Sequence, residues 1–282
     1  MWLWLSVSSA LLLGIYDVAK KQALKRNGVY WILVCSTALT ALFLTPFLSK
    51  GPFSDHLLLM LKAVLVSASW ISGLIAMKLL PLTTVSTIKA SRPMFVVIFS
   101  ILLFGERLNL LQWAGVAVVM SALLLSARLG NRETDKSASV RGMAAIILSV
   151  LTGAASALYD KYILQHMEPL FVQSWTNVYI TVLLAFVLLV QYLTDKGHFQ
   201  PFAWDWNIPL IAVLITLSDA IYFFAVKDPD AMISVISMIR RSSVLITFLG
   251  GVWIFKEGFV RRKALYMALM MAGIALLMLG SQ

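Results

Sequence analysis

The stretch that decides the fold of this chain runs from Thr83 to Glu106 and reads TTVSTIKASRPMFVVIFSILLFGE. It is long enough to cross a lipid bilayer, since a spanning helix needs about 20 apolar residues. Lys89 and Arg92, followed by Pro93, nevertheless lie inside its apolar run. A cation at membrane depth costs at least ~2.5–3.5 kcal/mol. The two charges therefore require a partner or a function.

A second stretch of the same kind lies far downstream, from Met232 to Glu257, and reads MISVISMIRRSSVLITFLGGVWIFKE. Arg240 and Arg241 lie at a similar depth within it. Each stretch ends on a phenylalanine, one further residue and a glutamate. The chain thus repeats one unusual feature, a membrane-length segment that carries two cations.

The composition is that of a polytopic membrane protein. Of the 282 residues, 60% are hydrophobic and 13% are charged, whereas soluble domains are roughly 45–50% apolar and about 25% charged. The single cysteine, Cys35, excludes an internal disulfide and argues against a cysteine-based metal site. The net charge of +10 fits Lys and Arg gathered at the cytoplasmic face better than it fits nucleic-acid binding.

The apolar pattern predicts an all-α protein with ten transmembrane helices. The most polar piece, residues 131–141, is predicted as a solvated linker loop between a first repeat, 1–130, and a second repeat, 142–282. The predicted spans are 2–24, 29–49, 57–79, 83–104, 109–128, 142–165, 170–193, 207–226, 231–255 and 264–280.

Matching residues indicate that the two five-span halves are repeats of each other. The Tyr-Asp pair at 16–17 in the first span corresponds to the Tyr-Asp pair at 159–160 in the sixth. Lys78 before the fourth span corresponds to Lys227 before the ninth. Because each half holds an odd number of spans, corresponding helices cross the membrane in opposite directions. The sequence therefore predicts an inverted-topology repeat, a common transporter architecture.

The basic residues also predict an orientation. Fourteen Lys and Arg residues fall in odd-numbered connections and nearby helix ends, against five on the other side. Cytoplasmic loops carry the excess of positive charge in membrane proteins. We therefore expect a protein of the bacterial inner membrane with both termini in the periplasm.

Three further features accompany the repeat: Pro93 within the fourth span, the run Phe-Gly-Glu-Arg-Leu at 104–108, and Gly115 in the fifth span. Together they resemble the EamA family of the drug/metabolite transporter superfamily, and the resemblance covers nearly the whole chain. It implies a ten-helix transporter of small metabolites with a central cavity between the two repeats.

The second half departs from this family pattern in two places. Ser242 or Val244 stands where the proline would be, and Lys256 replaces the glycine that precedes the final glutamate. The two halves of a site built between the repeats are therefore not expected to be identical.

The four deep cations predict an anionic or zwitterionic substrate. Lys89 and Arg92 are three residues apart and share one helix face, whereas Arg240 and Arg241 point about 100° apart. If these helices flank the cavity, the cations converge, and a phosphate or carboxylate that pairs with them relieves their repulsion. The alternatives are internal pairing with acidic residues, or extension of the long side chains to the membrane interface.

Three intramembrane carboxylates are candidates for proton coupling, because such groups often relay protons. They are Asp17, Asp160 and Asp219. Pairing is the favoured interpretation for Asp160, next to Lys161, and Asp219 is expected either to bind a proton or to pair with Arg241.

Aromatic residues are the last candidate group. They could line the cavity and hold a quaternary amine in a cage of rings, although packing and anchoring at the interface are the more ordinary roles. The candidates are Tyr16, Trp70, Tyr159, Trp175 and Tyr222.

The resulting prediction is a secondary active transporter that moves a small anionic or zwitterionic metabolite by alternating access, with proton or substrate-exchange coupling. The alternatives are a proton-coupled carrier of an amine and a flippase for a phosphate-bearing lipid. No hydrolase, P-loop or dinucleotide motif is present, and His56, His166 and His198 are scattered. We therefore expect no enzyme activity, no cofactor, no metal site and no nucleic-acid partner, but a lipid bilayer and a small-molecule substrate.

Overall fold

The computed structural model describes residues 2–92, 94–95, 99, 109–133, 136–163, 166–194, 201–227, 240 and 242–280. Ten α-helices and one short 3-10 helix make up the secondary structure of these residues, and no strand occurs among them. The elements are α1 (Trp2–Ala23), α2 (Val29–Phe43), η1 (Thr45–Phe47), α3 (Phe53–Leu79), α4 (Leu82–Lys89), α6 (Leu110–Glu133), α7 (Lys136–Ile163), α8 (Pro169–Thr194), α9 (Asn207–Lys227), α11 (Ser243–Trp253) and α12 (Val260–Leu279).

The ten predicted spans correspond to these ten helices in order. α2 ends earlier than its predicted span, because η1 follows it and Pro46 has no backbone N–H to continue the α-helix. For the fourth and ninth spans the structure describes only α4 and α11 with a few neighbouring residues. Pro93 and Arg241 lie outside the described residues.

The predicted linker loop at 131–141 is wrong for most of its length. α6 continues to Glu133 and α7 already begins at Lys136. Charged residues in water can stay helical at no desolvation cost, so a polar stretch marks where the chain leaves the apolar layer, not where its helix ends. The division of the chain into two repeats does not depend on this loop.

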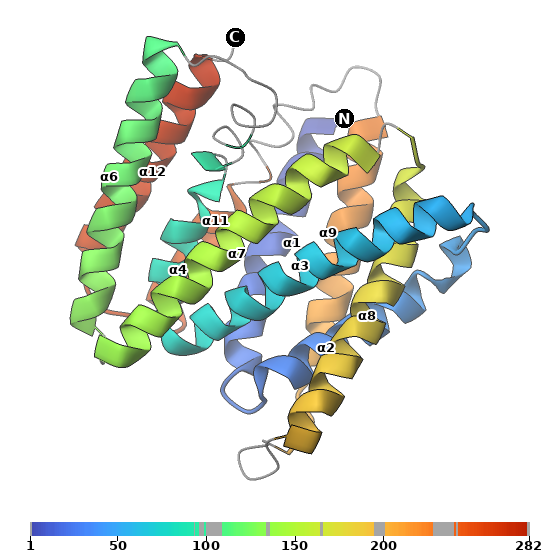
Figure 1. Cartoon of the computed structure of the whole chain (residues 1–282). Helices are drawn as coiled ribbons and strands as arrows, with labels where there is room; N and C mark the ends of the chain where they lie inside the picture. The colour runs from blue at the N-terminus through green and yellow to red at the C-terminus, as the bar shows by residue number, and fades with distance from the viewer. Residues whose placement is uncertain are drawn as a thin grey trace.

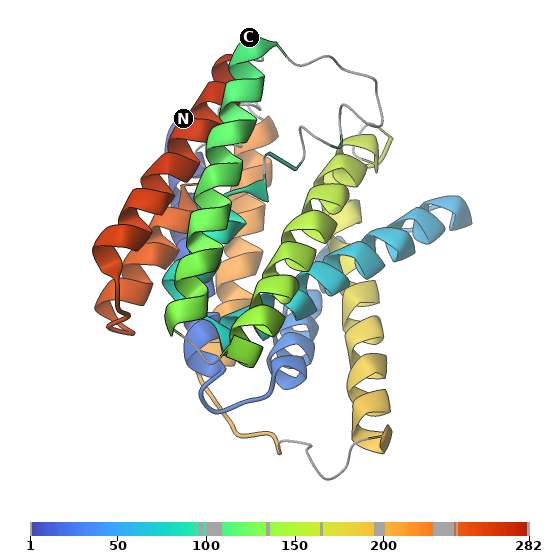
Figure 2. The ribbon, with the colours of Figure 1, turned by 60° about the vertical axis from the view of Figure 1, so that its left-hand side comes forward.

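The helix contacts follow a two-fold pattern. α1 packs along α9 and α3 packs along α7. The counterparts of α1 and α9 in the other half of the chain are α7 and α3, so these two contacts are equivalent. α6 with α12, α2 with α8, and α4 with α11 each join a helix to its own counterpart. Figures 1 and 2 show α6 and α12 side by side, with the start of α1 and the end of α12 at the same end of the bundle. This pattern is that of two related five-helix repeats.

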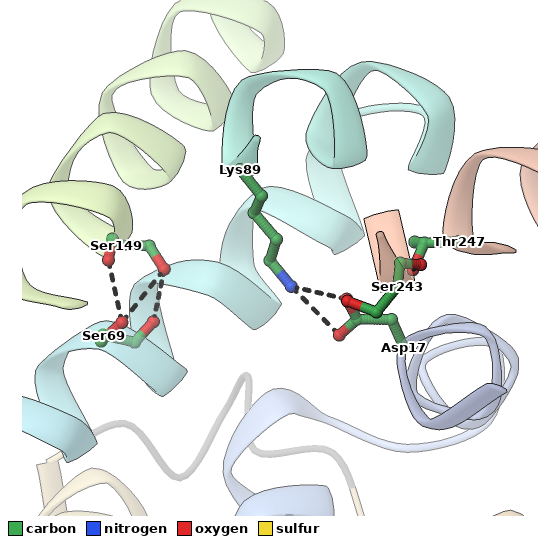
Figure 3. Close-up of polar contacts among 6 residues, drawn as sticks. All are labelled: Asp17, Ser69, Lys89, Ser149, Ser243 and Thr247. Atoms are coloured by element: carbon green, nitrogen blue, oxygen red, sulfur yellow. Dashed lines mark hydrogen bonds and ion pairs between the residues drawn. The ribbon is translucent and has the colours of Figure 1, made fainter. Parts of the chain in front are cut away.

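At each of these two equivalent crossings, a reciprocal pair of serines joins the two helices. Ser9 of α1 and Ser218 of α9 each donate a hydroxyl hydrogen bond of 2.9 Å to the other's carbonyl oxygen. Ser69 of α3 and Ser149 of α7 do the same at 2.8 and 2.7 Å (Figure 3). Small residues let membrane helices approach closely, and hydroxyl groups then bond across the contact. The same pair of serine hydrogen bonds thus stabilises both helix crossings.

A lysine caps the end of α3 just before the turn into α4. The ammonium group of Lys21, on α1, donates to the carbonyl oxygens of Met77 and, at 2.8 Å, of Leu80. The last carbonyl groups of a helix have no partner within the helix, and the negative end of the helix dipole favours a cation there. Lys21 therefore holds the C-terminus of α3 against α1.

A glutamate from the other half of the chain caps the start of α4. The Glu257 carboxylate accepts hydrogen bonds from the backbone N–H of Leu82, from the backbone N–H of Thr83 at 2.8 Å and from the Thr83 hydroxyl. The two N–H groups are among those that a helix N-terminus leaves without partners, and the helix dipole there favours a negative charge. Glu257 and Lys21 together fix the direction of α4, the helix that ends at Lys89. We call this pair of caps the α3–α4 clamp.

Gly251 explains how α11 comes close enough to carry this cap. A Cβ atom at Gly251 would lie 2.6 Å from Cγ2 of Thr83 and 3.1 Å from Oε2 of Glu257. A larger residue at this position would push α11 away from α4 and from the clamp.

We expect Lys256→Gly to stabilise the protein. Lys256 has a φ of 49°, a left-handed conformation that costs an L-residue roughly 1–2 kcal/mol. Glycine removes that strain. It also lowers stability by about 0.5–1 kcal/mol, because its unfolded state has more conformational entropy, so the net gain in stability is about 0.5–1 kcal/mol. Thermal unfolding of the purified protein in detergent measures it, with Lys256→Ala as the control that removes the side chain and keeps the strain. A melting temperature for Lys256→Gly at or below that of Lys256→Ala would contradict this explanation.

Candidate functional site

An ion pair between α4 and α1 is the centre of the candidate site. Nζ of Lys89 lies 3.0 Å from Oδ1 and 3.1 Å from Oδ2 of Asp17, and the two side chains are 19% and 17% exposed (Figure 3). Lys89 reaches from the last residue of α4 and Asp17 from the C-terminal half of α1. Lys89 therefore pairs with an acidic residue of the protein, which was one of the alternatives that the sequence left open.

A second ion pair joins Asp219 of α9 to Arg240, which lies shortly before α11. Nη2 of Arg240 contacts Oδ1 of Asp219, and its guanidinium carbon lies 4.2 Å from the ring centroid of Tyr222. Asp219 and Tyr222 are three residues apart on α9, so one arginine can reach both. Arg240 thus occupies the place that the sequence suggested for Arg241, which lies outside the described residues.

Arg92 differs from these two cations. Within the described part of the chain no carboxylate pairs with it, and its Nε is buried without a hydrogen-bond partner. Its guanidinium lies against the backbone of α7, where a Cβ atom at Gly153 would come within 2.5 Å of Cζ and Nη2. A buried donor without a partner costs about 1–3 kcal/mol, and more if it is charged. Arg92 therefore retains unused capacity to bind an anion.

Lys20 was considered from the sequence as a possible partner of Asp17 but was not predicted to bind the substrate. It is 4% exposed, and its Nζ lies 3.9 Å from the ring centroid of Tyr16 and 5.3 Å from that of Trp70. No carboxylate in the described residues pairs with it, because Asp17 bonds to Lys89. The four-residue spacing of Tyr16 and Lys20 on one helix was the available signal.

Charge does not balance among these groups. Lys20, Lys89, Arg92 and Arg240 are opposed, within the described residues, by the carboxylates Asp17 and Asp219. The difference is an excess of two positive charges, located on Lys20 and Arg92. We call Asp17, Lys20, Lys89 and Arg92 the α1–α4 basic group.

Asp160 has the pairing that the sequence favoured, with a lysine from another helix. Its Oδ1 lies 2.8 Å from Nζ of Lys62 on α3, and the side chain of Lys161 lies outside the described part of the structure. The Tyr159 hydroxyl donates to the carbonyl oxygen of Leu58 at 3.2 Å. Both contacts join α7 to the N-terminal half of α3, and they give Asp160 and Tyr159 structural partners.

Trp175 lies in an aromatic cluster that includes Tyr179. Its Nε1 donates to the carbonyl oxygen of Ser49 at 2.8 Å, and its ring meets His56 edge to face at 4.7 Å. Tyr159 and Trp175 pack in one apolar cluster, whereas Tyr16 and Trp70 pack in another. The structure therefore does not gather the five predicted aromatic residues around one point. A role for Tyr159 and Trp175 in binding stays a prediction.

Among the residues described, no three histidine, cysteine, aspartate or glutamate side chains converge to hold a metal ion. The chemistry that the α1–α4 basic group offers is the binding of an anion by an ammonium and a guanidinium group, which form charge-assisted hydrogen bonds.

The model of a protein family matches the chain in two segments, residues 1–128 and 140–279, and the family is described as the EamA-like transporter family. The chain belongs to this family. Members of the EamA-like family are transporters, and this one is an integral membrane protein. The two matched segments correspond to the two five-helix repeats.

Helix length and hydropathy agree with a protein that crosses a membrane. Three described stretches are long and apolar enough to span it by these criteria, namely Phe53–Leu79, Ala138–Asp160 and Pro169–Thr194. Four shorter apolar helices accompany them, including Asn207–Tyr222 and Ser243–Trp253.

One sequence relative agrees with the family, and one solved structure agrees with the fold. An uncharacterized transporter in the cobO 3' region of Sinorhizobium sp. is 35% identical over 79 residues, which is 28% of this chain and 56% of that relative. The matched region thus spans little more than half of that relative. A crystal structure of a protein with 15% identity has a TM-score of 0.61 and covers 96% of this chain and 97% of its own. At this identity the likeness shows a shared fold alone.

We expect Asp17→Asn to destabilise the transporter by about 3 kcal/mol, because removal of one partner leaves Lys89 charged and unpaired in a largely buried place. The double variant Asp17→Asn, Lys89→Met should recover most of that loss. Unfolding of the detergent-purified variants measures both changes, and Glu168→Gln, at an exposed position, is the control. If the single and the double variant were equally unstable, Asp17 would act through something other than Lys89.

Proposed function

We propose that this EamA-like transporter carries a small metabolite that bears a phosphate or carboxylate group, and that the α1–α4 basic group binds that anion. The observation that supports the proposal is Arg92, a membrane-depth guanidinium whose Nε is buried without a hydrogen-bond partner and which pairs with no carboxylate of the described residues. Arginine binds phosphate and carboxylate through two parallel hydrogen bonds.

Energetics favour a transient anion over permanent isolation of this charge. A charge without a partner in a low-dielectric interior costs several kcal/mol. A substrate anion removes that cost on arrival and restores it on departure. A site of this kind binds well enough to take up its substrate and still releases it.

Pairing of the acidic residues argues against an amine as the substrate. A cation carrier needs a carboxylate that is free to receive its cargo. Asp17 bonds to Lys89 and Asp219 bonds to Arg240, and Asp160 bonds to Lys62. The three carboxylates are instead suited to proton coupling, since protonation of any of them would break an ion pair that joins two segments of the chain.

The α3–α4 clamp supports transport by alternating access. Lys21 comes from the first repeat and Glu257 from the second, and both hold the same turn between α3 and α4. Rocking of one repeat against the other around a central site would have to break the Glu257 cap of this clamp at one end of the bundle. The positive-inside distribution assigns that end to the cytoplasm of a bacterial inner membrane, with both termini outside.

We expect Arg92→Ala to lower anion uptake at least about tenfold without blocking insertion, because hydrogen bonds to a charged group contribute about 1.5–3 kcal/mol each. Uptake is measured with proteoliposomes that receive labelled inorganic phosphate, glycerol 3-phosphate, succinate or choline from outside, and exchange is measured with vesicles loaded with the unlabelled compound. Arg261→Ala, at an exposed position in the first turn of α12, removes the same charge elsewhere and should leave uptake unchanged. Uptake of choline alone, or unaltered anion uptake by Arg92→Ala, would refute the proposed function.

A further inference from the structure

The α1–α4 basic group consists of two pairs of charged residues that one ion pair connects. Asp17 and Lys20 are three residues apart on α1, which places them on one helix face. Lys89 ends α4, and Arg92 follows it after a turn at residues 90–91. The Asp17–Lys89 ion pair joins the two pairs, so Lys20 and Arg92 are the outer members of one connected set.

Asp17 has a second cation within reach along its own helix. Lys20 follows it by three residues, and among the described residues its ammonium group contacts only the rings of Tyr16 and Trp70. A cation over an aromatic ring gains about 0.5–2 kcal/mol, which is less than a buried ion pair provides. The rings hold Lys20 ready next to a carboxylate that is engaged by Lys89.

We propose that the α1–α4 basic group selects a doubly charged anionic head of the phosphate-monoester or phosphonate class, and that Lys20 is the residue that determines this selection. The inference rests on the proposed function and narrows its substrate class. An anion that takes Lys89 and Arg92 releases Asp17, and Asp17 then pairs with Lys20.

The charges then balance only for a dianion. Lys20, Lys89 and Arg92 provide three positive charges, Asp17 provides one negative charge, and two remain for the ligand. A monoanion leaves one cation without a partner in a largely buried place, which is costly. A compact tetrahedral group presents several oxygens, so that Lys89 at the end of α4 and Arg92 shortly after it can share one anion.

Two small probes of nearly the same shape test this selection. Methyl phosphate is doubly charged at pH 8, since its second ionisation lies near pH 6, whereas dimethyl phosphate has a single acidic proton and carries one charge at this pH. Both are added to the full-length transporter in nanodiscs, and affinity follows from the rise in melting temperature with ligand concentration. We expect methyl phosphate to bind at least about tenfold more tightly, which corresponds to one lost charge-assisted interaction.

Variants at Lys20 then separate selection from folding. Lys20→Met leaves one excess positive charge, so the ratio of the two affinities should fall toward one or below it, while Lys20→Arg should restore the preference. Lys50→Met, at an exposed position, is the control and should bind like the wild type. The wild-type ratio tests the proposal even if Lys20→Met fails to fold.

The outcomes distinguish the two proposals. If the wild type binds both probes equally, the selection of a doubly charged head is overturned while an anion site remains. If it binds succinate, whose two charges lie on separate carboxylates, but not methyl phosphate, the phosphate-monoester or phosphonate class is overturned while an anion site remains. If the wild type binds neither probe nor succinate, the proposed function itself is overturned. Glycerol 3-phosphate added in solution and phosphatidic acid added to the nanodisc present the same head group, and the one that stabilises the protein identifies a soluble or a lipid source.

Discussion

Compensation of charge inside an apolar layer is the constraint on which the rest of this structure depends. Lys89 remains within the bundle because Asp17 faces it from another helix, and Arg240 remains there because Asp219 and the ring of Tyr222 receive it. Lys20 and Arg92 have no carboxylate of this kind in the described part of the chain. The scaffold thus satisfies part of its buried charge by itself, and under the proposed function a substrate anion satisfies the rest.

The position of α4 depends on contacts made far from the charges that it carries. Lys21 and Glu257 hold the turn before α4 from two different repeats, and Gly251 permits the close approach that Glu257 needs. The strained backbone at Lys256 lies next to this glutamate, at the place where the family pattern has glycine. The α3–α4 clamp thus joins both repeats and lies next to a strained residue.

The two repeats are alike as a scaffold and different as a site. The reciprocal serine pairs occupy equivalent crossings, between α1 and α9 and between α3 and α7. The acidic residues do not follow this symmetry, since Asp17 pairs with Lys89 across to α4 while its counterpart Asp160 pairs with Lys62 of α3. Packing repeats because each helix pair buries similar small residues, whereas a binding site for one asymmetric substrate has no reason to repeat its charges.

The sequence by itself determined the family, the ten helices and the identity of the unusual cations, because apolar runs and the charges that interrupt them are properties of the local chain. It was wrong about the polar linker, where helices α6 and α7 continue through charged residues. Only the tertiary structure decided which acid meets which base: Lys62 with Asp160, Lys89 with Asp17 and Arg240 with Asp219. It also decided that Lys20 lies over aromatic rings and that Arg92 faces a glycine. Long flexible side chains can reach several partners, so their pairing is settled by how neighbouring helices cross, which no local pattern records.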